Sequence, residues 1–128
     1  MPTAVTHHIR ISAEPRYEPQ HSDPRAARFI FSYRITIANL GRDTVQLLRR
    51  RWRIADSAAP VRIVEGPGVI GQTPVLAPGE EFSYESGCDL RSGLGRMEGS
   101  YTMQRTADGR MFRVDVPTME LRWPWVLN

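Results

Sequence analysis

The stretch RFIFSYRITIANL, residues 28–40, decides the fold class of this chain. Its side chains alternate between apolar and polar with the two-residue period of a β-strand. The apolar face carries Phe29, Phe31, Tyr33, Ile35 and Ile37, and the polar face carries Arg28, Ser32, Arg34 and Thr36. We therefore predict a half-buried strand whose aromatic and branched side chains enter a core.

The sequence on both sides of this strand continues the β pattern. We predict one strand over residues 5–13, with His7 and His8 on opposite faces, and another over residues 45–56. In the second of these, one face carries Leu48, Arg50, Trp52 and Ile54, and the other carries Leu47, Arg49, Arg51 and Arg53. Shorter strands are predicted over residues 61–65, 81–86, 99–105, 111–116 and 118–123.

Turn signals separate these strands, and no window has the 3.6-residue period of a helix. Residues 39–43, 77–82 and 107–110 each hold a glycine in a turn-forming context. Residues 14–26 contain three prolines and are predicted to form an extended, flexible loop. We expect one all-β domain over residues 1–128, an antiparallel sandwich of two sheets with about seven to nine strands. Its residues 1–27 would form an N-terminal strand and the flexible proline-rich loop.

The composition is that of an ordinary globular domain, with 41% hydrophobic and 24% charged residues. The formal net charge of +3 is too small to indicate a nucleic-acid partner. Cys88 is the only cysteine, so no intramolecular disulfide can form. The first ten residues lack the apolar core of a signal peptide, and no apolar run approaches the length of a membrane helix. We expect a cytoplasmic protein without membrane association.

Three glycines, Gly66, Gly68 and Gly71, have the spacing of a pyrophosphate-binding loop. A dinucleotide fold needs a helix directly after such a loop, but Pro74 and Pro78 follow instead. The simpler interpretation is that the glycines permit tight turns or close backbone approach. A nucleotide or pyrophosphate compound held by the three glycines with nearby Arg62 is the alternative.

The densest charge cluster is RRRWR, residues 49–53. In a strand, Arg49, Arg51 and Arg53 line one face, and Arg34 or Arg28 on a neighbouring strand would extend them into a basic patch. Such a patch is either a solvated outer face or a surface for an acidic protein partner. We hypothesise that these three arginines bind a partner, and that Arg50 makes a structural contact to Asp56 or another carboxylate.

Other reactive side chains show no functional pattern. Adjacent histidines in a strand cannot easily share one metal ion, and no nucleophile motif surrounds Cys88. The carboxylates form no pair suited to acid–base catalysis. We predict no catalytic residues, no metal site and no cofactor.

Several longer motifs together resemble one known family, the ApaG (CorD) family. They are Tyr33-x-Ile35-x-Ile37-x-Asn39, Leu48-x-Arg50-x-Trp52-x-Ile54-x-Asp56, Gly66-x-Gly68-Val69-Ile70-Gly71, Pro74-x-Leu76-x-Pro78-Gly79-Glu80 and Met97-x-Gly99-x-Tyr101-x-Met103. The resemblance covers nearly the whole chain. Residues 86–99 depart most from the family pattern, through Cys88 and additional glycines.

The resemblance implies a sandwich of the immunoglobulin or fibronectin type III kind and no established enzyme activity. Bacterial ApaG proteins are associated with cobalt resistance and magnesium efflux, and similar domains in eukaryotic proteins are presumed to bind protein. We therefore expect a non-enzymatic protein-interaction or regulatory module whose link to cations is indirect. Binding of a nucleotide or pyrophosphate compound remains the alternative.

Overall fold

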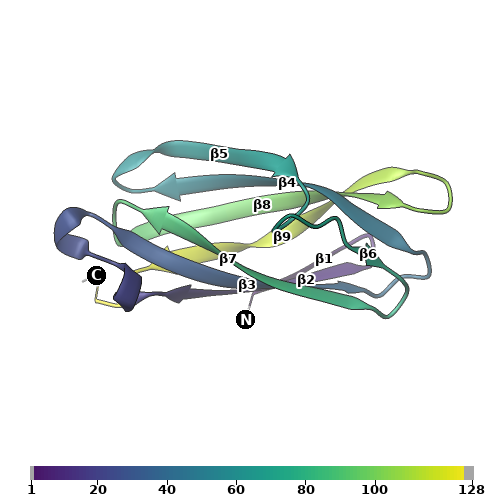
Figure 1. Cartoon of the computed structure of the whole chain (residues 1–128), viewed down its shortest axis with the longest axis horizontal. Coiled ribbons are helices and arrows are strands. Elements are labelled where there is room, and N and C mark those ends of the chain that lie inside the picture. Colours follow the sequence, from purple (N-terminus) through teal and green to yellow (C-terminus); the bar gives the residue numbers. More distant parts are fainter. Residues whose placement is uncertain (1, 126–128) are drawn as a thin grey trace.

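The computed structural model describes residues 2–125 and consists of two antiparallel β-sheets packed face to face in an elongated sandwich (Figure 1). The first sheet has the order β1 (Thr3–Thr6), β2 (Ile9–Tyr17), β3 (Phe29–Asn39) and β7 (Glu81–Leu90). The second has the order β5 (Ala59–Pro67), β4 (Val45–Asp56), β8 (Leu94–Arg105) and β9 (Met111–Arg122), with β6 (Val75–Leu76) paired to β4. The predicted all-β sandwich of about seven to nine strands is confirmed.

The core lies between the two inner faces. The apolar face of residues 28–40 is buried as predicted, with Ile35 and Ile37 fully inaccessible. Trp52 and Ile54 of β4 and Val114 of β9 meet it from the second sheet, whereas Phe112 is only partly buried. The rings of Tyr33 and Trp52 stand edge to face at 5.7 Å, so aromatic packing joins the sheets at their centre.

The single strand predicted over residues 5–13 is wrong, because the chain turns at His7 and His8. These residues have φ angles of 49° and 65° and connect β1 to β2 as an antiparallel hairpin. A two-residue hairpin with both φ values positive matches the right-handed twist of its strands, although Asn-Gly is the usual sequence for it. The histidines therefore do not alternate across a strand but stand together at one end of the sandwich.

The predicted faces of β4 are correct for Arg49, Arg51 and Arg53 but wrong for Leu47. Leu47 is fully buried and pairs with Met103, and the next paired residue is Arg49, so Leu48 is the extra residue of a β-bulge. A bulge shifts the alternation by one residue. This explains how Leu47 and Trp52, five positions apart, both face the core.

Several segments are more regular than predicted. Residues 14–17 belong to β2 and pair with β3, and only residues 18–28 form a loop, which contains two 3₁₀ turns, η1 (Pro19–His21) and η2 (Pro24–Ala26). The strands predicted over 61–65, 81–86 and 99–105 extend to Ala59–Pro67, Glu81–Leu90 and Leu94–Arg105. The two strands predicted over 111–116 and 118–123 are wrong as separate elements, because one continuous strand, Met111–Arg122, spans both.

The polar core residue Asn39 fixes the connection from β3 to β4. Its Nδ2 donates to the carbonyls of Asp43 and Leu76, at 2.8 and 3.0 Å, and its Oδ1 accepts from the amide of Gly41 at 3.0 Å. This connection crosses from the first sheet to the second. No helix between residues 2 and 125 is long and apolar enough to span a lipid bilayer.

Candidate functional site

The glycine motif lies at the end of β5 and shapes a tight loop. Gly68 and Gly71 have φ angles of 62° and 76°, a region that other residues rarely adopt. A Cβ on Gly68 would stand 2.3 Å from the carbonyl oxygen of Gln72, whereas a Cβ on Gly71 would meet open space. The backbone of this loop therefore requires glycine at position 68 for two independent reasons.

Several amides of this loop already have backbone partners. The amide of Gly68 donates to Leu48 at 2.8 Å, and Val69 and Gln72 bond each other reciprocally at 2.8 and 2.9 Å. A phosphate-binding loop instead presents consecutive free amides to its ligand. The local geometry therefore favours the turn interpretation of the glycines.

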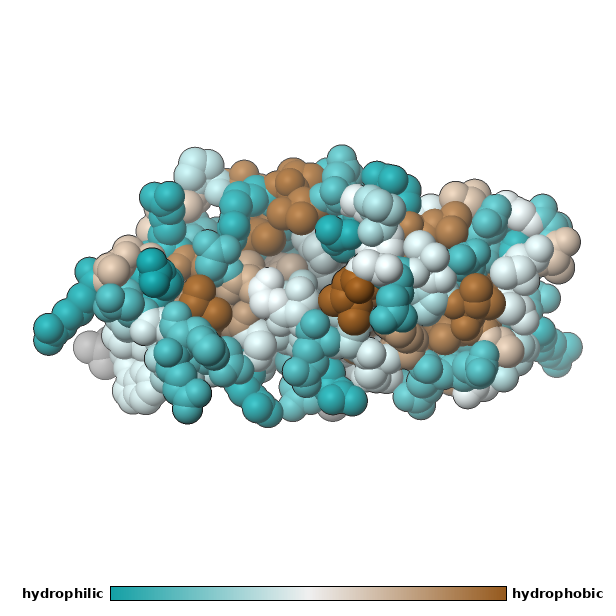
Figure 2. Space-filling model, viewed as in Figure 1, coloured by the Kyte–Doolittle hydropathy of each residue, from teal (hydrophilic) through white to brown (hydrophobic). Residues whose placement is uncertain are grey.

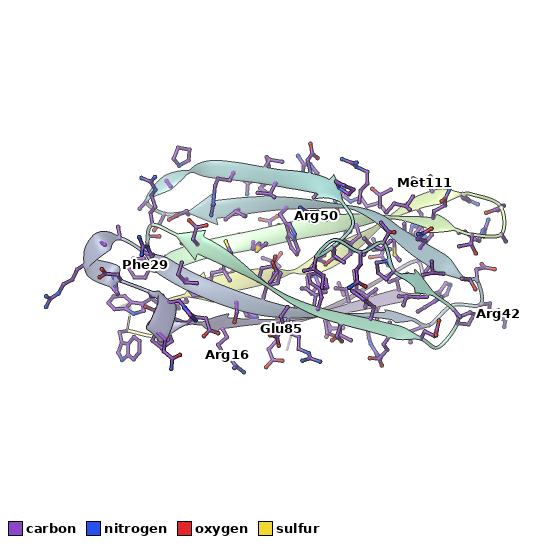
Figure 3. The ribbon with its side chains drawn as sticks, in the orientation of Figure 1. Arg16, Phe29, Arg42, Arg50, Glu85 and Met111 are labelled. Carbon is purple, nitrogen blue, oxygen red and sulfur yellow. The ribbon has the colours of Figure 1, made fainter. Side chains whose placement is uncertain are left out.

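Arg50 makes the structural contact that the sequence indicated, but with a different partner. Its guanidinium Nη1 donates to the carbonyl oxygens of Pro67 and Gly68 at 2.9 and 3.0 Å (Figure 3). The expected pairing with Asp56 is wrong, because that carboxylate accepts from the amides of Arg91 and Ala58 instead. Arg50 thus holds the glycine loop against β4.

Arg62 does not join the glycines, although it is close in sequence. It pairs opposite Ile54 while Gly66 pairs opposite Arg50, so the two lie about 13 Å apart along β5. The Arg62 guanidinium bonds Asp89 of β7, with Nη1 3.4 Å from Oδ1. It closes one side of the sandwich by linking an edge strand of each sheet.

The arginine row on β4 is exposed as predicted, but the larger basic patch is wrong. Arg34 lies in the other sheet, where it pairs with Glu85 at 3.6 Å. The strands beside β4 carry acids instead: Arg51 lies 3.5 Å from Glu65, and Arg53 lies 3.7 Å from Glu98. Within residues 2–125, Arg49 has no ion pair.

β5 is an open edge with apolar side chains, which the sequence analysis did not identify as a site. In the part of the chain that the structure describes, it pairs only with β4. Val61, Ile63 and Val64 expose 49%, 46% and 39% of their surface. Apolar atoms gather along this edge in Figure 2. The apolar residues of VRIVE, residues 61–65, indicated a strand in the sequence, but only the order of strands in the sheet shows that this strand is an edge.

A buried group of tyrosines lies between the sheets. The hydroxyls of Tyr84 and Tyr101 share a hydrogen bond. Burial raises the pKa of both phenols and of Tyr33, and the nearby Arg50 charge opposes that rise. These phenols stay protonated at neutral pH, so their contribution is a satisfied polar contact inside the core.

The remaining candidate groups do not converge. Burial raises the pKa of the Cys88 thiol to about 11, which keeps it from acting as a thiolate nucleophile at neutral pH. Among residues 2–125, no group of three or more histidine, cysteine, aspartate or glutamate side chains is placed to hold a metal ion. His21 lies on η1, while His7 and His8 lie in the β1–β2 turn.

Comparison with known proteins gives matches over almost the whole chain. A family model described as the ApaG domain matches residues 19–105. Protein ApaG of Methylobacterium sp. (strain 4-46) is 46% identical over 123 residues, which cover 96% of this chain and 94% of that protein. Protein ApaG of Brucella anthropi is 46% identical over 121 residues, covering 94% and 92%. The crystal structure of a Bordetella pertussis protein described as ApaA is 38% identical, covers 98% of both chains and has a TM-score of 0.87.

Proposed function

Because the chain belongs to the ApaG family, we propose that it is a non-catalytic protein-interaction module that binds a partner along the β5 edge. The observation that carries this proposal is the nine-residue edge strand with exposed Val61, Ile63 and Val64. Its action would be cytoplasmic, where the free thiol of Cys88 stays reduced. Any part in cation homeostasis would pass through the partner.

An open edge strand offers backbone donors and acceptors to an extended segment of another protein. Edges that avoid such pairing carry charges, prolines or very short strands. β5 has Pro60, Glu65 and Pro67, but the run between the two prolines also exposes branched aliphatic side chains. Val61 and Ile63 are two residues apart, so they share a face of the strand and form one apolar contact. A partner strand with apolar side chains at alternate positions fits this surface.

Arg49, Arg51 and Arg53 lie on β4, the strand paired with β5. Ile63 pairs opposite Arg53, and Glu65 opposite Arg51, on the outer face of the second sheet. Arg49, Arg51 and Arg53 therefore lie two strand spacings, about 10 Å, from the strand that would be added to β5. Long guanidinium side chains so placed would recognise acidic residues on the partner and raise its rate of association.

The test is site-specific photo-crosslinking in cells, with the photoreactive residue at position 63 or, as a control, at exposed Arg10 of β2. We expect one protein to crosslink from position 63 and not from position 10. The variant Val61→Lys/Ile63→Lys should then lose capture of that protein, because two ammonium groups would oppose apolar strand pairing.

Val5→Lys is the matched control, since Val5 is an exposed valine on β1, an edge strand of the other sheet. It should leave capture unchanged. Equal capture by wild type and the Val61→Lys/Ile63→Lys variant, with both folded, would exclude β5 as the binding edge.

A further inference from the structure

The backbone of β5 turns a defined set of hydrogen-bonding groups away from β4. The amide of Gly68 donates to the carbonyl oxygen of Leu48 at 2.8 Å, and the register of β5 with β4 continues from this pair. Hydrogen-bonded and non-hydrogen-bonded pairs alternate along an antiparallel ladder. The N–H and C=O groups of Ile63 and Glu65 therefore point toward the open edge. Pro67 has the same orientation, so its missing N–H costs no bond to β4.

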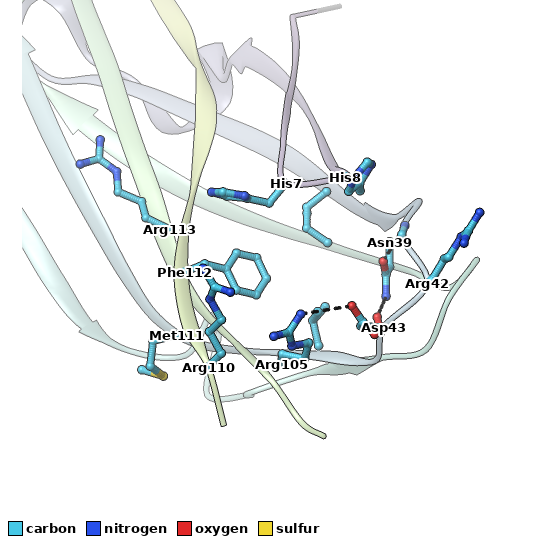
Figure 4. Close-up of a pocket in the computed structure, with 13 residues that line it drawn as sticks. His7, His8, Asn39, Arg42, Asp43, Arg105, Arg110, Met111, Phe112 and Arg113 are labelled. Atoms are coloured by element: carbon cyan, nitrogen blue, oxygen red, sulfur yellow. Dashed lines mark hydrogen bonds and ion pairs between the residues drawn. The ribbon is translucent and has the colours of Figure 1, made fainter. Parts of the chain in front are cut away.

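Two of the other sheet edges are covered or short. The β1–β2 hairpin covers β9: the imidazole of His7 stands edge to face with the ring of Phe112, with centroids 5.5 Å apart (Figure 4). The amide of Asp115 on β9 also donates to Oγ1 of Thr6 at 3.2 Å. β1 itself has only four residues, and short edge strands pair poorly.

β7 is an edge with an acidic outer face. Glu81, Glu85 and Asp89 are exposed on that face at even spacing. Two copies paired through β7 would bring like charges onto adjacent strands, which destabilises the pairing. Among the edges of residues 2–125, β5 is therefore the one best suited to pair with a second copy, and Figure 1 shows it as the outermost strand of its sheet.

We propose that two copies of this chain pair through their β5 edges, antiparallel about a two-fold axis at Val64, into a weak dimer that covers the edge until the partner displaces it. In this register Ile63 of one copy lies opposite Glu65 of the other. The outward N–H and C=O groups of both residues are then paired across the interface. The displacement by a partner rests on the function proposed above, whereas the dimer itself does not.

The apolar side chains of β5 complement one another in this register. Val64 lies on the inner face, opposite Trp52, and would meet Val64 of the other copy at the axis. Val61 lies on the outer face and would stand opposite Pro67 of the other copy. Because Val64 and Val61 are 39% and 49% exposed in the single chain, the pairing removes apolar surface from water.

The charges across the interface also match. Glu65 lies 3.5 Å from Arg51 of its own copy. In the dimer, a row across the outer face would run through Arg53 and Ile63 of one copy and then Glu65 and Arg51 of the other. Each carboxylate would therefore lie between arginines of both copies, which lowers the repulsion between the two arginine rows.

The paired segment is too short for a permanent dimer. It covers residues 61–67 of each copy, because Pro60 and Pro67 bound the run of available backbone groups. Stable complexes bury about 800 Å² on each partner, and one short strand pair covers less. The dimer should therefore form reversibly at high protein concentration, so that a partner with additional contacts can replace the second copy.

Disulfide trapping tests the register, in a Cys88→Ala background so that only introduced thiols react. In an oxidised glutathione buffer, Val64→Cys should crosslink to itself several-fold faster than Val5→Cys, an exposed control on β1. Directly opposite Cα atoms in a non-hydrogen-bonded pair lie about 4.5 Å apart, within the range of a disulfide. Ile63→Cys should crosslink to Glu65→Cys but not to itself, because diagonal residues lie about 7–8 Å apart.

Sedimentation velocity tests the dimer in the chain without introduced thiols. The wild type and the matched control Val5→Lys should both show a dimer that grows with concentration, and Val64→Lys should stay monomeric. The amide NMR spectrum of each variant reports whether it is folded.

Three results would each overturn the dimer: Val64→Cys crosslinking no faster than Val5→Cys, Ile63→Cys crosslinking to itself as fast as Val64→Cys, or a wild type that is monomeric at every concentration. The partner crosslinked in cells from position 63 decides the proposed function separately. A dimer without such a partner refutes that function alone, and a partner without a dimer refutes this inference alone.

Discussion

At the residue scale, Arg50 is a charged side chain on an apolar strand face that stabilises the fold by bonding to the backbone. Its partners are two backbone carbonyls, because the loop after β5 turns its acceptors toward β4. The alternation of β4 predicted that Arg50 points inward with Trp52. It could not predict the partner, because the path of the loop depends on glycine conformations and not on side-chain pattern.

We expect Arg50→Gln to lower the free energy of unfolding by about 2 kcal/mol, because a shorter neutral amide cannot replace two charge-assisted hydrogen bonds. Urea denaturation measures this loss. Arg49→Gln, one position away and without an ion pair, should stay within about 0.5 kcal/mol of wild type. Equal losses in the two variants would show that the carbonyl contacts contribute nothing specific.

Cys88 predicts how stability depends on pH. Burial raises its pKa to about 11 in the folded protein, compared with about 8.5 in an unfolded chain. The folded state thus holds the proton more tightly. The stabilisation is fully present below pH ~8.5 and is lost as the pH rises toward 11.

We expect the wild type to lose about 1–2 kcal/mol more stability than Cys88→Ala between pH 7 and pH 10, as measured by urea denaturation at both values. Ionisation of the buried tyrosines destabilises the wild type and Cys88→Ala alike as the pH rises, so this contribution cancels in the comparison. Parallel pH profiles for the two proteins would show that the thiol is not protected from ionisation.

At the scale of elements, bulges and hairpins limited what alternation could predict. In β9, Val116 pairs opposite Gly99 and Met119 opposite Met97, so two residues stand opposite Glu98. This irregularity buries both Val116 and Met119, which are three positions apart. Alternation predicts faces within a regular run, but it does not place the extra residue, which is set by pairing with a distant strand.

Two glycine-to-alanine substitutions in the glycine loop distinguish backbone strain from steric collision. Gly71→Ala should cost about 1 kcal/mol, because the left-handed conformation is strained but the space is open. Gly68→Ala should cost at least twice as much, because its Cβ would also collide with the Gln72 carbonyl. Thermal unfolding of both variants measures the difference. Similar losses would mean that the loop relaxes around position 68.

At the scale of the whole molecule, the sequence predicted the sandwich but not the distribution of its strands. β3 and β4 follow one another through a short connection yet lie in different sheets. For that reason Arg34 faces Glu85 and not the arginine row of β4.

The last prediction concerns the arginine row on the outer face of the second sheet. Arg49, Arg51 and Arg53 changed together to Gln would break two exposed ion pairs, at 3.5 and 3.7 Å. Such pairs contribute about 0–1 kcal/mol each, so the variant should remain folded. If the proposed partner approaches β5 with acidic residues, its association should slow and lose much of its salt dependence.

The matched control changes Arg10, Arg16 and Arg34 to Gln, which also removes three positive charges but from the first sheet. Both variants reduce the formal net charge from +3 by three units to zero. A slower association in the β4 variant alone, with the partner crosslinked from position 63, would place acidic contacts beside β5. If association slows equally in both variants, the effect comes from net charge and not from the position of the arginines. If association is unchanged in the β4 variant, Arg49, Arg51 and Arg53 do not belong to the binding surface.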